Sequence, residues 1–162
     1  MFHVGFGSAN REAEIRKIAG SDRTTALILA AVHFEWMLKR SLLKLGVSPT
    51  KDLRKQLEYV FRVERKDGRD GYKEVWDREV AKRFKNAALG TVLGRLNRIQ
   101  THALDVRGKV IHGNGTVSNA SADEAIELFL GTGPKLRDFA TKHDVDLDAR
   151  LKARPTLKVD TV

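Results

Sequence analysis

The clearest pattern in the chain is an apolar stripe between residues 23 and 45. Apolar side chains recur there at steps of three and four, which is the spacing of one face of an α-helix, at Leu27, Ala31, Phe34, Leu38, Leu42 and Leu45. Asp22 is a favoured N-cap residue, and Gly46 favours the end of a helix. The pattern therefore predicts a central helix from Arg23 to Leu45.

The same spacing predicts further helices in residues 10–19, 51–63, 73–87, 88–111 and 121–142. Residues 64–72 are polar with two glycines and indicate a loop, and only residues 1–6 suggest an extended segment. Gly131 and Pro134 are expected to kink or split the last helix. Gly90 and Gly94, four residues apart, would let another helix approach closely. We predict an all-α bundle of about five helices.

The length of the chain, 162 residues, is typical of one domain. We expect a single domain over 1–162, with flexible ends at about 1–9 and 145–162. The longest apolar run, Ala26–Val32, is too short to cross a bilayer, and the first eleven residues do not resemble a secretory signal. These features favour a soluble, cytoplasmic protein with no membrane partner.

Positive charge is concentrated in the middle of the chain. The net charge is +9, and residues 49–100 alone hold 14 basic and 8 acidic residues, whereas residues 116–162 hold 7 and 8. A basic surface attracts polyanions, of which nucleic acid is the commonest. The alternative is a solvated surface that only keeps the protein soluble.

Several kinds of site do not fit the sequence. Without cysteine there is no thiolate zinc site, and the five histidines never occur as HxH or HExxH. The GNG sequence at 113–115 follows a predicted helix rather than a strand, so it is no dinucleotide fingerprint. We expect no metal and no cofactor.

One segment combines residues that suit acid–base and phosphate chemistry. Arg107 and His112 occur where the helix predicted over 88–111 gives way to a loop. Five helical steps rotate by about 140° and rise by about 7.5 Å, so both side chains lie around the same end of the helix. Asp105 precedes His112 by seven residues and would share its face. A structural alternative is that Arg107 is a helix-end charge and His112 a capping residue.

The sequence RGKVIHG around this pair resembles the HEPN superfamily, which is marked by an arginine and, four to six residues later, a histidine near the end of a long helix. The similarity extends over residues 22–142, with an early helix rich in Ala and Leu and a final helix at SADEAIELF. It implies an α-bundle that forms a homodimer, with two Arg–His pairs facing one cleft. Many members are metal-independent endoribonucleases, often toxins held by an antitoxin or antiviral effectors. Others have lost catalysis and bind RNA, nucleotides or proteins.

The resemblance and the chemistry together predict RNA cleavage to 2′,3′-cyclic phosphate ends. Histidine suits the transfer of protons from the 2′-hydroxyl and to the leaving oxygen, and arginine binds phosphate through its planar fork. The position after the arginine is often polar in active members, whereas here it is Gly108. The alternatives are a non-catalytic HEPN module that binds RNA, nucleotide or protein, and an unrelated basic DNA-binding protein.

Other residues are candidates for supporting roles. Lys109 and Asn114 are expected to touch RNA phosphate, or else to be solvated. Glu35 on the central helix could orient Arg107 or His112 from a facing helix, or pair with Lys39 one turn away. We expect His33 to be partly buried in its helix and His102 to lie on the surface.

Overall fold

The computed structural model describes residues 7–62 and 68–155, without the side chains of 59–62 and 68–70. Every regular element in these ranges is helical, which confirms the all-α prediction: α1 Ser8–Ala19, α2 Arg23–Leu45, α3 Thr50–Arg62, α4 Gly68–Trp76, the π-helical η1 Asp77–Ala81, α5 Leu89–Leu93, α6 Leu96–Arg98, the π-helical η2 Ile99–Ala103, α7 Leu104–His112, α8 Asn119–Leu130 and α9 Thr132–Thr141. None of these helices is both long and apolar enough to cross a membrane. The expected extended start at residues 1–6 lies outside the described residues.

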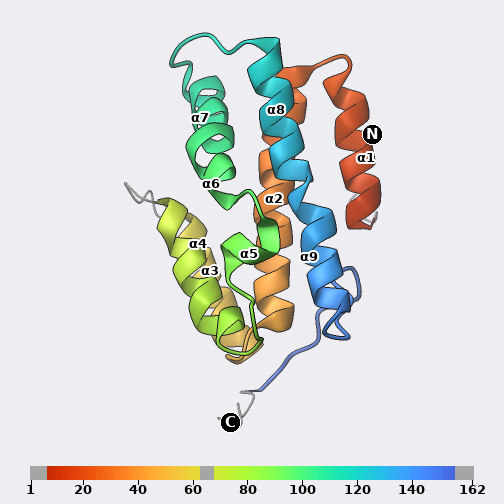
Figure 1. Ribbon diagram of the computed structural model, residues 1–162, viewed down its shortest axis with the longest axis vertical. Coiled ribbons are helices and arrows are strands. Elements are labelled where there is room, and N and C mark those ends of the chain that lie inside the picture. The colour runs from red at the N-terminus through yellow and green to blue at the C-terminus, as the bar shows by residue number, and fades with distance from the viewer. Residues whose placement is uncertain (1–6, 63–67, 156–162) are drawn as a thin grey trace.

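Helix α2 is the centre of the bundle. It packs against α1, α8 and α9 along much of its length and also contacts α3 and α7. Figure 1 shows α8 and α9 following one another along α2, with α1 on one side and α6 and α7 on the other. Every neighbour covers part of the apolar stripe, which is why α2 holds more of the core than any other helix described here.

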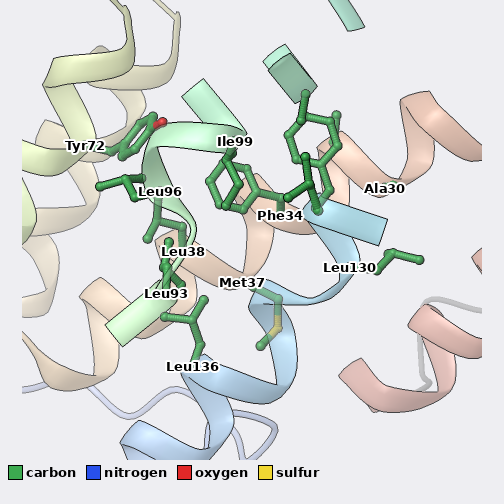
Figure 2. Close-up of a cluster of buried hydrophobic side chains, with 14 of the residues drawn as sticks. Ala30, Phe34, Met37, Leu38, Tyr72, Leu93, Leu96, Ile99, Leu130 and Leu136 are labelled. Atoms are coloured by element: carbon green, nitrogen blue, oxygen red, sulfur yellow. The ribbon is translucent and has the colours of Figure 1, made fainter. Parts of the chain in front are cut away.

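The core fills the space between α2 and the short helices that follow α4. Figure 2 shows Phe34, Met37 and Leu38 of α2 beside Leu93 of α5 and Leu136 of α9. All five side chains are almost completely buried. Burying a side chain of this size stabilises the fold by about 1.5–3 kcal/mol. These contacts hold α5 and α9 at fixed positions on α2.

The predicted ends of α2 are confirmed. Asp22 accepts a hydrogen bond from the backbone N–H of Thr25 at 2.9 Å, and the N–H of Gly46 donates to the carbonyl of Leu42. The predicted break near Gly131 is also confirmed, because α8 ends at Leu130 and α9 begins at Thr132.

Several boundaries differ from the prediction. The helix predicted over 73–87 ends earlier, because α4 and η1 together stop at Ala81. A single helix over 88–111 is wrong, because Gly94 adopts the left-handed conformation at φ 69° and ends α5. Gly90 and Gly94 do not admit a closely packed helix either: an added Cβ would meet only the side chain of Leu96 or Lys135. The loop expected over 64–72 is helical from Gly68, and residues 63–67 lie outside the described ranges.

Part of the tail that was expected to be flexible is packed on the bundle. Leu147 is buried, and the guanidinium of Arg154 donates to the carbonyl of Leu43 at 2.9 Å. The backbone N–H of Ser8, the first residue of α1, donates to the Asp148 carboxylate at 3.0 Å. Residues 145–155 therefore lie against α1 and α2, and α1 begins at Ser8. The flexible ends predicted at 1–9 and 145–162 thus include residues that pack on the bundle.

Candidate functional site

Helix α7 presents the Arg107–His112 segment at its C-terminal end. It continues directly from η2, and the buried side chains of Ala103 and Val106 hold it against the bundle. It ends at His112, because Gly113 is left-handed at φ 64° and its N–H donates to the carbonyl of Lys109. The predicted end of the helix is therefore correct, and it leaves His112 on the last turn.

Arg107 and His112 are both accessible to a ligand. Arg107 is half-buried and His112 is exposed. Within the part of the chain that the structure describes, neither side chain has a hydrogen bond or an ion pair. A half-buried charge loses part of its hydration, and this cost is compensated only when a partner of opposite charge or a hydrogen-bond acceptor is present. The Arg107 guanidinium thus keeps its donors available for an anion.

The other candidates near this site are Asp105 and Lys109, which form an ion pair on α7, and Asn114 in the loop that follows it. Lys109 Nζ lies 2.9 Å from Asp105 Oδ2, in an i,i+4 ion pair with both side chains about half exposed. Such a pair contributes little to stability, about 0.3–0.5 kcal/mol. Asp105 thus neutralises Lys109 rather than supporting His112. Asn114 is exposed, and its backbone N–H donates to the carbonyl of Lys109.

Glu35 does not contact Arg107 or His112 in the described chain. It is half-buried on α2, and among the described contacts it has no hydrogen bond or ion pair with Arg107 or His112. The role of orienting either residue is therefore not seen in the monomer.

Gly108 stands in open space. An added Cβ would have no neighbour within 4 Å, so a larger side chain would fit at this position. The glycine is thus not required by packing.

Apolar side chains are exposed on α7 and on the neighbouring helix α2. Ile28 and Val32 of α2 and Ile111 of α7 are the exposed large hydrophobic residues of the described chain, at 37%, 57% and 42%. Because α2 contacts α7, the three lie on neighbouring helices. Exposed apolar groups beside charged ones are typical of surfaces that bind a protein.

A second cluster that contains an arginine and a histidine lies before the start of α7. Glu124 on α8 forms an ion pair with Arg98 at 2.7 Å, and its carboxylate lies 3.2 Å from Nε2 of His102 on η2. The hydrogen bond from Arg98 holds the pKa of Glu124 below its ordinary value. His102 is half-buried rather than on the surface, and no sequence pattern indicated its contact with α8.

A third cluster is buried. Glu12 on α1 accepts hydrogen bonds from Arg137 on α9 at 2.7 and 2.8 Å and from His33 on α2 at 3.1 Å. Glu12 and His33 are almost completely buried, so the expectation that His33 is only partly buried is wrong. Burial by itself raises the pKa of Glu12, but the bonds and charges of Arg137 and His33 outweigh it and lower the pKa below 4.5. This cluster fastens three helices together.

Within the described ranges no group of three or more acidic or histidine side chains could hold a metal ion. Comparison with known proteins adds no relative: no family model, no curated protein and no solved structure matches the chain.

Proposed function

We propose that the protein is a metal-independent endoribonuclease of the HEPN type, in which Arg107 and His112 act on RNA. The observation that carries the proposal is the state of this pair at the end of α7. Both side chains are accessible and neither has an ion pair in the described chain, whereas the other Arg–His clusters are neutralised by a glutamate. A phosphate group can therefore approach Arg107 without displacing a carboxylate.

The reaction assigns one role to each residue. His112 accepts the proton of the 2′-hydroxyl, and the oxygen attacks the adjacent phosphorus to form a 2′,3′-cyclic phosphate. The bond to the 5′-oxygen breaks, and that oxygen takes a proton from a second histidine. Arg107 binds the phosphate oxygens while negative charge builds up on them.

The need for a second histidine supports a homodimer as the active form. One chain supplies one His112, and a two-fold axis near it would bring a second copy to the same phosphate. Ile111 of α7 and Ile28 and Val32 of the neighbouring helix α2 offer apolar area for such a contact. In this arrangement one His112 accepts the proton and the other donates one.

The second candidate is a HEPN module that binds RNA without cutting it, and Gly108 is the observation that favours it. Because a side chain would fit there, packing does not explain why this position lacks the polar side chain that active HEPN members often have. Gly108→Asn separates the candidates when it is compared with the wild type: a decayed site cuts RNA only after the substitution, whereas an active enzyme cuts RNA without it.

The test is the cleavage of a DNA strand that contains a single ribonucleotide. We expect one cut, a cyclic phosphate on the 5′ fragment, and an unchanged rate in EDTA. The all-DNA strand should survive, because it has no 2′-hydroxyl. If the wild-type protein binds this strand and never cuts it, the enzyme proposal is wrong.

Arg107 variants assign the cut to this site. Arg107→Ala should remove cleavage and weaken binding, since a charge-assisted hydrogen bond contributes about 1.5–3 kcal/mol. Arg107→Lys keeps the charge without the planar fork and should restore part of the binding. Arg54→Ala, an exposed residue of α3, is the matched control and should leave cleavage unchanged.

A further inference from the structure

Two cavities lie along the line where α5 and α6 meet α8 and α9. The first, about 250 Å³, includes Arg95 and Thr132 in its walls, and the second, about 280 Å³, includes Thr91 and Phe139. Lys135 borders both cavities and donates a hydrogen bond to the carbonyl of Leu93 at the end of α5. The two cavities share Lys135 as a wall and are called together the α5–α9 groove. Figure 1 shows the neighbouring helices α5 and α9 that border it.

One face of α9 forms the long wall of this groove. Lys135, Phe139 and Lys142 are spaced by four and three residues, so they lie on the same side of the helix. Seven residues of helix rise by about 10 Å, which separates the Cα atoms of Lys135 and Lys142 along the groove. Along this wall, Phe139 therefore lies between Lys135 and Lys142.

The charge of the groove is positive although the C-terminal part of the chain is not. The acids of α8 are each paired with an arginine from another element: Asp123 with Arg23, Glu124 with Arg98 and Glu127 with Arg16. No carboxylate pairs with Arg95, Lys135 or Lys142 in the described contacts. Asp138 is the remaining acid in the groove walls.

We propose that the α5–α9 groove binds single-stranded RNA as a second contact surface, with phosphates at Arg95, Lys135 and Lys142 and an unstacked base in each cavity. The choice of RNA rests on the proposed function. The cavities, of about 250 and 280 Å³, are smaller than the usual pockets for drug-sized ligands, and the second one offers the ring of Phe139 to a base. Bases in a duplex are stacked and cannot enter such cavities, whereas single strands insert bases beside aromatic rings.

The groove also has a consequence for the substrate. It lies along the side of the bundle, whereas His112 lies at the end of α7, so both surfaces are used together only by an RNA strand that extends from one to the other. A long single strand should therefore bind more tightly than a fragment that fills the candidate catalytic site alone.

The test measures binding by fluorescence anisotropy, using a 2′-O-methyl single strand of about 12 nucleotides, a length within known single-strand site sizes. This strand lacks the 2′-hydroxyl and cannot be cut. Arg95→Ala with Lys142→Ala should weaken binding at least about tenfold at low salt. The slope of log affinity against log salt should fall by about 1.4, because each lost phosphate contact contributes about 0.7. The matched control, Lys51→Ala with Arg54→Ala on α3, removes the same charge from exposed positions and should leave the slope unchanged.

A second variant tests the cavities apart from the charges. Thr91→Trp fills the second cavity from an exposed position without changing charge. It should weaken binding of the single strand and leave the salt slope as it is. A duplex of the same sequence should bind more weakly than the single strand and should not respond to Thr91→Trp.

Three results would overturn the groove proposal: groove variants that bind like the control, a duplex that binds as tightly as the single strand, or polyglutamate that displaces RNA as well as RNA does. Binding is measured without cleavage, so the two proposals fail separately. Protein that cuts RNA but binds it independently of Arg95 and Lys142 contradicts the groove alone. Protein that binds through the groove and never cuts contradicts the nuclease alone.

Discussion

The bundle holds an arginine and a histidine together in two very different settings. At the Glu12 cluster, His33 and Arg137 converge on one carboxylate between α1, α2 and α9, and two of the three side chains are almost completely buried. At the end of α7, Arg107 and His112 share one helix, face solvent and have no carboxylate partner in the described contacts. The same residue types therefore serve packing in one place and are available for chemistry in the other.

The difference shows why residue type alone does not identify a site. A buried charge must be paired, so the Glu12 cluster has its hydrogen-bonding capacity used within the fold. An accessible cation without a partner keeps that capacity for a ligand. If this comparison is right, changes at the Glu12 cluster alter stability, and changes at the end of α7 alter function with little effect on stability.

The largest expected effect on stability comes from Glu12→Ala. The substitution leaves Arg137 and His33 facing each other without a carboxylate, and breaking a buried pair in this way costs about 3–5 kcal/mol. We expect about 3 kcal/mol, because the Arg137 side chain is 23% exposed and can be partly hydrated. Urea unfolding measures the loss. The control is Glu14→Ala on the same helix, which removes an exposed pair with Lys17 and should cost less than about 1 kcal/mol.

Two glycines sharpen the comparison because alanine should have opposite effects at them. At Gly133 an added Cβ would lie 1.9 Å from Oε1 of Glu12, and Glu12 cannot move without breaking its bonds to Arg137. Gly133→Ala should therefore destabilise the fold by about 1–3 kcal/mol. At Gly108 the space is open, so Gly108→Ala should stabilise α7 by about 0.5–1 kcal/mol. Equal effects in thermal unfolding would contradict the packing described for Glu12.

A smaller effect is expected in the dependence of stability on pH. The pKa of Glu12 is lower in the folded protein than its ordinary value of 4.5, so the folded state binds its proton less readily than the unfolded state. The stability that this carboxylate contributes is therefore complete above pH 4.5 and is lost as the pH falls through the folded pKa. Glu12→Gln has no proton to bind, and its free energy of unfolding should fall less steeply with acid than that of the wild type. Parallel curves for the two proteins would show that Glu12 is not the group responsible.

Much of the fold could be predicted where a local signal marks both ends of a helix. For α2, the apolar stripe, Asp22 and Gly46 agree, and the helix has the predicted bounds. The segment 88–111 has an equally regular stripe, yet the left-handed Gly94 and the π-helical turn η2 divide it. Apolar spacing could not show this division, because the buried residues of the short helices recur along the sequence at the same steps of three and four as in one long helix.

Long-range polar contacts explain the rest of the differences. The tail over 145–155 has no apolar period, and Arg154 holds it by donating to the backbone carbonyls of Leu43 and Lys44 at the end of α2. A carbonyl acceptor leaves no trace in the sequence, so this docking could not be predicted. The end of α7 was predictable because Gly113 follows His112 directly. The absence of Glu35 from that site could not be predicted, since it depends on how α2 and α7 are rotated about their axes relative to one another.

The central claim is that His112 is a catalytic residue and His33 a structural one. The most direct measurement compares His112→Ala with His33→Ala for the rate of RNA cleavage and for urea unfolding. We predict that His112→Ala lowers the cleavage rate about 10²–10⁴-fold and changes the free energy of unfolding by less than about 0.5 kcal/mol. His33→Ala should lose about 1–3 kcal/mol of stability and still cleave RNA where it is folded. Cleavage that persists in His112→Ala would contradict the account.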